Sequence, residues 1–195
     1  MGYYGVRGAI VVYLINGQFG FEPEMVYQYY GASVMMVYFA RIIGGVTGDV
    51  LLKSKWATAT GAFLQTIGVL LLCLPFIPTL IMGIILILIG NGLYTPNCLA
   101  GIGRIYHHHS KGLDSIYTLF LLITNVGALL ISVLGALELG AISMFVLCAV
   151  FFIFAGVLTL LSKSAEVYEL DDQKGIGIGR KVLLVISGSV IFGSF

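Results

Sequence analysis

The amino-acid sequence predicts an all-α membrane protein: a bundle of six transmembrane helices followed by the start of a seventh. Of its 195 residues, 59% are hydrophobic and 10% are charged, whereas soluble globular domains carry about 25% charged residues. The hydrophobic residues form runs near the roughly 20 helical residues that cross a bilayer. Such runs are too long for strands, and an open sheet in lipid would leave backbone groups unpaired.

Composition and spacing argue against several other classes. Ten Lys and Arg residues balance nine Asp and Glu residues, a net charge of +1, so we expect no nucleic-acid partner. The cysteines lack metal-ligand spacing, and His107–His109 point around a helix rather than toward one ion. The sequence contains no catalytic triad and no pair of carboxylates within an apolar span. We therefore expect neither an enzyme nor a bound metal or cofactor.

The apolar spans lie in chain order near 3–15, 25–48, 57–76, 80–104, 115–137 and 141–162. A longer polar segment, 163–181, separates them from a last apolar run at 182–195. We interpret 1–162 as an amino-terminal six-helix bundle, 163–181 as a cytoplasmic linker and 182–195 as the start of a seventh helix. That run is too short to cross a bilayer, so we expect the chain to be a fragment of a longer protein.

The distribution of basic residues predicts the orientation of the bundle. Eight of the ten Lys and Arg residues follow spans 2, 4 and 6, and the alternate loops carry none; the eight are Lys53, Lys55, Arg104, Lys111, Lys163, Lys174, Arg180 and Lys181. Basic residues accumulate on cytoplasmic loops. The amino terminus of this multi-pass protein is therefore predicted to be cytoplasmic.

Span 1 carries a polar face within its apolar sequence. Tyr3, Tyr4 and Arg7 have the spacing i, i+1, i+4, which places both tyrosines on the same side of the helix as Arg7. Arg7 could extend its head group to the membrane surface. Alternatively, a guanidinium in a water-excluded cavity would bind a carboxylate through two parallel hydrogen bonds.

Span 2 repeats this pattern at its cytoplasmic end. Tyr38, Arg41, Gly45 and Asp49 follow steps of three and four and so line one stripe of the helix. Arg41 and Asp49 lie about two turns apart, too far for a direct pair. Each is therefore expected to find another partner, in a structural or a transport role.

Spans 4 and 5 contain the remaining polar signals. In span 4, Pro96 has no amide proton to donate to the carbonyl of Gly92, so the helix is expected to bend before Asn97. In span 5, Asn125 would form a hydrogen bond between helices or line a cavity.

Four of these segments, in order, resemble the proton-dependent oligopeptide transporters of the major facilitator superfamily. The similar segments are Tyr3–Arg7, Gly44–Asp49, Gly90–Asn97, and Asp114 followed by Phe120, Asn125, Gly127 and Ala128. The resemblance implies an amino-terminal bundle of two inverted three-helix repeats, whose cavity face holds a peptide against a carboxy-terminal six-helix bundle missing from this sequence. It also implies a location in the cell membrane.

The resemblance assigns roles by position. Arg7, Tyr3, Tyr4, Tyr38 and Asn125 would line the site for a small peptide, with Arg7 on its carboxylate. Asp49 would belong to the cytoplasmic gate, and Gly45, Arg41, Gly92, Pro96 and Asn97 are the accompanying gate or structural positions. A proton would be the coupling ion.

The sequence also departs from the family pattern. The Glu-x-x-Glu-Arg segment linked to proton coupling would lie before Met1, and Thr95 stands where the family has a lysine. Leu121 replaces an aromatic residue, and Val50 replaces a basic one. These departures leave open a second interpretation, a membrane subunit that keeps the bundle without transporting.

Overall fold

The computed structural model describes residues 2–16, 19, 21–50, 52–106, 110–136 and 140–162. Within them the chain forms six helices: α1 (Gly2–Asn16), α2 (Pro23–Val50), α3 (Ser54–Leu72), α4 (Ile77–Tyr106), α5 (Ser110–Ala136) and α6 (Ala141–Leu161). Their number and order confirm the six predicted spans. The predicted linker, 163–181, and the predicted seventh helix, 182–195, lie outside the described residues.

The largest error in the predicted boundaries concerns the third span. The sequence predicts it at 57–76, but α3 begins at Ser54 and ends at Leu72. The amide of Cys73 donates to the carbonyls of Leu70 and Leu71, which closes the last turn. The helix cannot continue, because Pro75 disfavours helical geometry in the residue before it. The next helix then starts at Ile77, with a proline in its first turn, where the missing amide costs nothing.

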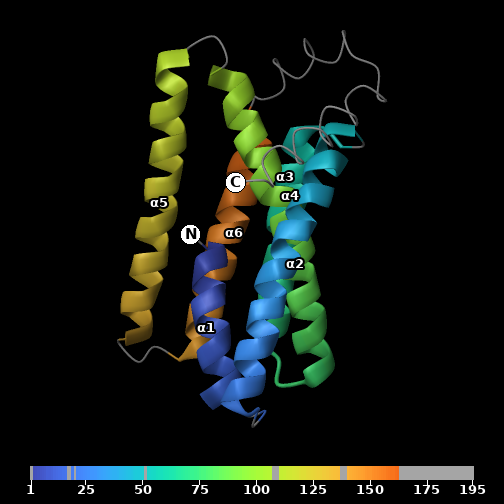
Figure 1. Cartoon of the computed structure of the whole chain (residues 1–195), viewed down its shortest axis with the longest axis vertical. Coiled ribbons are helices and arrows are strands. Elements are labelled where there is room, and N and C mark those ends of the chain that lie inside the picture. Colours follow the sequence, from blue (N-terminus) through green and yellow to red (C-terminus); the bar gives the residue numbers. More distant parts are fainter. Residues whose placement is uncertain are drawn as a thin grey trace.

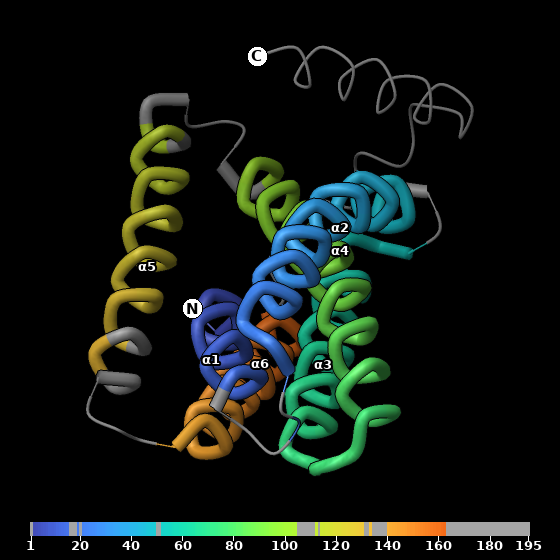
Figure 2. Tube along the Cα trace, turned by 60° about the horizontal axis from the view of Figure 1, so that its bottom comes forward, coloured from blue at the N-terminus to red at the C-terminus, as the bar shows by residue number. Residues whose placement is uncertain are grey.

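The six helices run along the long axis of the molecule (Figure 1). Helix α3 packs against α4 and α6, α2 packs against α4, and α1 packs against α6 and α5. Figures 1 and 2 show α5 at the edge of the bundle, next to α1. Side chains of α1, α3, α4 and α6 form the apolar core, including Val6, Leu72, Phe145, Cys148 and Phe152.

Three helices are long and apolar enough to cross a membrane by themselves: Pro23–Asp49 in α2, Ile77–Arg104 in α4 and Ala141–Leu161 in α6. The apolar parts of α1 and α5, Gly2–Ile15 and Asp114–Leu130, are shorter. Helix α3 buries the polar side chains of Ser54, Thr58, Gln65 and Thr66. It tolerates them because it packs against α2, α4 and α6, and its hydroxyl groups donate to backbone carbonyls.

Glycines allow α2 and α4 to approach at backbone distance. A methyl group on Gly44 would overlap the backbone of Gly92, one on Gly92 would overlap Ala40, and one on Gly48 would overlap the amide of Asn97. Small residues of this kind are the usual means of close helix contact in membranes. The contact between α2 and α4 therefore depends on three positions without side chains.

This contact generates a first prediction. The Gly44→Ala substitution should lower the unfolding temperature of the detergent-solubilised protein, since overpacking costs about 1–3 kcal/mol. Gly31→Ala is the matched control on the same helix, because a methyl group there meets nothing within 4 Å. It should leave stability unchanged or raise it slightly through the better helix propensity of alanine. Equal shifts for the two variants would contradict the packing role of Gly44.

Helix α4 continues through Pro96 from Ile77 to Tyr106. Its last turns lean toward α5 in Figure 1, where the hydroxyl of Tyr117 donates to the carbonyl of Leu99 over 3.3 Å. The predicted bend between Gly90 and Pro96 remains a prediction. The helix axes on either side should differ by more than about 20° in an experimental structure, and a deviation below about 10° would contradict a hinge there.

Candidate functional site

The polar face of α1 is closed by a tyrosine of α2. The Nε atom of Arg7 donates a hydrogen bond of 3.0 Å to the hydroxyl of Tyr30. The guanidinium carbon lies 5.4 Å from the centre of that ring, 5.9 Å from the Tyr3 ring and 5.8 Å from the Tyr4 ring. Electrostatic attraction to aromatic faces stabilises the cation in a partly desolvated environment. Arg7 is thus anchored by three phenols and keeps its two terminal nitrogens uncommitted among the described residues.

A second arginine lies between α2 and α4. The Nε atom of Arg41 donates to Oδ1 of Asn91 over 3.1 Å, and its guanidinium carbon lies 5.5 Å from the Tyr38 ring. Thr95, one helical turn after Asn91, places its hydroxyl 3.5 Å from the same oxygen. Asn91 is 2% exposed, whereas Tyr38 is 60% exposed. The arginine therefore has one buried polar anchor and one open side.

Toward the end of α2, a buried amide joins the two helices. Nδ2 of Asn97 donates to the carbonyl of Gly44 over 2.9 Å and to that of Leu93 over 2.7 Å. A methyl group on Gly45 would meet the ring of Pro96 at ordinary contact distance, so this position, unlike Gly44 and Gly48, has room for a small side chain. The Ser54 hydroxyl donates to the Asn97 carbonyl over 2.8 Å, which ties α3 to the same point. Asn97 thus links three helices where Pro96 interrupts the hydrogen-bond ladder of α4.

The seam between α2 and α4 ends in an ion pair. Nη2 of Arg104 lies 2.8 Å from Oδ1 of Asp49, and both side chains are a little over one quarter exposed. The spacing of Arg41 and Asp49 predicted that each would bond elsewhere, and the structure confirms it, with Asn91 and Arg104 as the partners. We call the contacts Arg41–Asn91, Gly44–Asn97 and Asp49–Arg104 the α2–α4 seam.

The structure brings most, but not all, of the predicted site residues together. Arg7 is bonded to Tyr30 of α2, and Tyr38 and Arg41 belong to the same helix, so the Arg7 cluster and the seam lie along one helix. Asn125 is exposed on α5 and takes no part in the Arg7 cluster. Its predicted place beside Arg7 and Tyr38 is untested and stays a prediction.

Sequence reasoning missed three partners. Tyr30 belongs to a tyrosine-rich run that begins α2, and its eleven-residue separation from Arg41 is close to three helical turns. That spacing could have placed it on the arginine stripe. Asn91 lies inside the recognised Gly90–Asn97 motif, and its position near the centre of an apolar span was the available signal. Arg104 was counted only as a loop charge, because nothing in one sequence pairs it with Asp49.

Six packed helices, with a polar seam between α2 and α4 and three helices apolar enough to cross a membrane among the described residues, define a helical bundle of the membrane-protein class. A dipeptide and tripeptide permease B from Photorhabdus asymbiotica is 31% identical over 97% of this chain, which covers 40% of that protein. A permease of the same name from Yersinia enterocolitica is 32% identical with the same coverage. No family model matches the sequence.

Solved structures agree with these relatives. A bacterial homologue of the human drug peptide transporters matches all of this chain and 46% of its own, with 25% identity and a TM-score of 0.71. A POT family transporter in complex with 5-aminolevulinic acid matches 97% of this chain and 43% of its own, with 25% identity and a TM-score of 0.75. Nearly the whole chain is thus similar to part of a dipeptide and tripeptide permease, and it spans about two fifths of the length of these curated relatives.

The ion pair at the end of the seam generates a further prediction. Asp49→Asn and Arg104→Gln should each lower stability in detergent, and the double variant should lose less than the sum. We expect a coupling of about 0.2–1 kcal/mol, because the pair is partly exposed. The double variant is needed because Arg104 makes a further interaction. The stability lost in Arg104→Gln alone therefore exceeds the contribution of the ion pair. Strict additivity would show that the pair does not hold the helix ends together.

Proposed function

We propose that this chain forms the amino-terminal half of a secondary transporter for di- and tripeptides, which works by alternating access against a second six-helix bundle. Its similarity to dipeptide and tripeptide permeases over 97% of its length supports this proposal. So does the site on α1 and α2, where Arg7 is held by Nε alone. A guanidinium fixed at one edge can present its two terminal nitrogens to a carboxylate as a planar fork. This is the observation that carries the proposal.

The same proposal assigns roles to the remaining site residues. Tyr3, Tyr4 and Tyr38 flank the two arginines at ring distances below 6 Å, so they would offer phenol groups to a peptide beside Arg7. Asn125 would join them when α5 closes on the peptide. Asp49, with its partner Arg104, would stabilise the cytoplasmic gate. The protein would move its substrate unchanged, without enzymatic chemistry.

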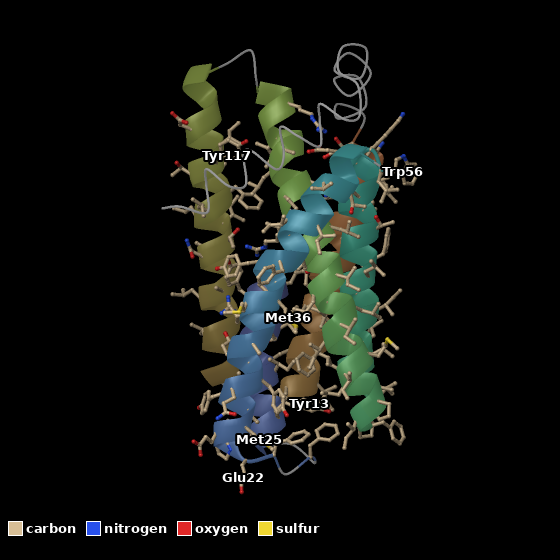
Figure 3. The ribbon with its side chains drawn as sticks, turned by 45° about the vertical axis from the view of Figure 1, so that its right-hand side comes forward. Tyr13, Glu22, Met25, Met36, Trp56 and Tyr117 are labelled. Carbon is tan, nitrogen blue, oxygen red and sulfur yellow. The ribbon has the colours of Figure 1, made fainter. Side chains whose placement is uncertain are left out.

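We also propose that the bundle lies in the cell membrane with its amino terminus in the cytoplasm. Lys53 and Lys55 adjoin Trp56, which lies at one end of the molecule, whereas Glu22 lies at the other (Figure 3). The tryptophan suits a membrane interface, and the basic residues beside it mark the cytoplasmic side. A proton is the coupling ion that the resemblance to proton-dependent oligopeptide transporters suggests. Uptake driven by an inward proton gradient and abolished by an uncoupler would test it.

The function is tested on the complete gene product that contains this chain. Arg7→Lys should raise the KM for peptide uptake about ten- to a hundredfold, since a charge-assisted hydrogen bond contributes roughly 1.5–3 kcal/mol and 1.4 kcal/mol is about a factor of ten. The reason is geometric: an ammonium keeps the charge but cannot form the two-donor fork. Uptake into proteoliposomes measures it.

Peptides with an amidated carboxyl terminus provide the control. They should compete poorly against the unmodified protein and should be nearly indifferent to Arg7→Lys. If Arg7→Lys weakens the apparent affinity for free and amidated peptides equally, Arg7 stabilises the fold or the gate and does not bind the substrate carboxylate. If the folded, membrane-inserted protein takes up no peptide at all, the alternative holds, a membrane subunit that does not transport.

A further inference from the structure

Arg41 is an intramembrane cation whose described partners are all neutral. Its Nε atom donates to the amide oxygen of Asn91, and its guanidinium lies over the ring of Tyr38. By contrast, Arg104 on α4 meets a carboxylate, that of Asp49. A cation held in a low-dielectric region is stabilised most strongly by an anion. Arg41 therefore has a place for an anionic partner.

The described helices do not supply that anion. Among the described residues the carboxylates are Glu22, Glu24, Asp49 and Asp114. Asp49 is bound to Arg104, Glu22 and Glu24 lie at the opposite end of α2 (Figure 3), and Asp114 is exposed near the start of α5. The middle of the bundle thus holds two arginines without a carboxylate among the residues that the structure describes.

The contacts of Arg41 fix its orientation. Asn91 is 2% exposed and cannot move aside, and the Thr95 hydroxyl approaches the same amide oxygen. Because the hydrogen bond to Asn91 uses Nε, the two terminal nitrogens of Arg41 can still donate to a ligand. The guanidinium lies over the exposed ring of Tyr38. Thr95 on α4 thus shares the amide oxygen of Asn91 with the cation that comes from α2.

Arg7 and Arg41 lie along the same stripe of α2: Arg7 is bonded to Tyr30 of that helix, and Arg41 follows Tyr30 by eleven residues, close to three helical turns. Two like charges at this depth disfavour each other, and a ligand with two carboxylates would relieve both. We propose that Arg41 is a second anion-binding side chain of the peptide site, one that takes the side-chain carboxylate of a peptide. The transporter then selects acidic peptides. This inference rests on the proposed function.

Uptake of two matched dipeptides, Ala-Glu and Ala-Gln, tests the inference, because they differ in a single side-chain charge at nearly constant shape. In the complete gene product reconstituted in proteoliposomes, the KM for Ala-Glu should be at least about tenfold lower than that for Ala-Gln, as expected for one charge-assisted contact. Arg41→Gln retains a donor for Asn91 but removes the charge, and it should bring the ratio close to one.

Two further variants separate recognition from folding. Arg41→Lys keeps the charge and should retain part of the preference, which a merely structural role for Arg41 would not predict. Tyr29→Phe is the matched control on α2, because Tyr29 is 67% exposed and has no role in the site. It should leave the ratio of the two KM values as it is.

The outcomes distinguish this inference from the function on which it rests. Uptake of both peptides with equal KM values overturns the acidic preference and leaves peptide transport standing. A preference for Ala-Glu that survives in Arg41→Gln assigns recognition to another cation and overturns the role of Arg41. Uptake of neither peptide by the folded protein overturns both proposals.

Discussion

The close approach of α2 and α4 is the constraint on which the rest of the site depends. It exists because Gly44, Gly48 and Gly92 carry no side chains, so that one helix backbone lies directly against the other. At that separation, the amide of Asn97 reaches a carbonyl on the opposite helix. A side chain on any of these glycines would separate the helices and leave a buried amide without its partner, which costs more than the lost bond.

The same approach brings the charged groups of the two helices within reach. Arg41 finds Asn91 one turn before the glycine contact, and Asp49 finds Arg104 at the helix ends. The apolar core on the other side, formed by α1, α3, α4 and α6, provides the rigid support against which the seam is held. Helix α5, at the edge of the bundle, contributes little to either.

Residue spacing predicted those features that depend on one helix at a time. The six spans follow from the length of the apolar runs, and the stripe of Arg41 and Asp49 follows from steps of three and four. Residue spacing could not predict pairings between helices. Tyr30 and Arg7 are 23 positions apart in the sequence, and Arg104 and Asp49 are 55 positions apart. The predicted end of α3 was wrong for a local reason. Hydrophobic residues continue past Leu72, but the helix ends there because Pro75 follows. The place of Asn125 beside Arg7 and Tyr38 stays a prediction, because spacing along α5 does not say how closely that helix packs against the others.

Arg7 and Arg41 bond neutral groups, whereas Arg104 bonds a carboxylate, and this difference affects ligand binding. A guanidinium paired with a carboxylate of its own bundle would have to break that pair before it could bind a second anion, and the loss would offset most of the gain. Instead, Nε of Arg7 donates to the phenol of Tyr30, and Nε of Arg41 donates to the amide oxygen of Asn91. These neutral acceptors fix the plane of each guanidinium without neutralising it. A ligand carboxylate then meets a cation already oriented and not yet compensated, so binding requires little ordering of the protein. Arg104 has the opposite arrangement, consistent with a contact that holds helices rather than ligands.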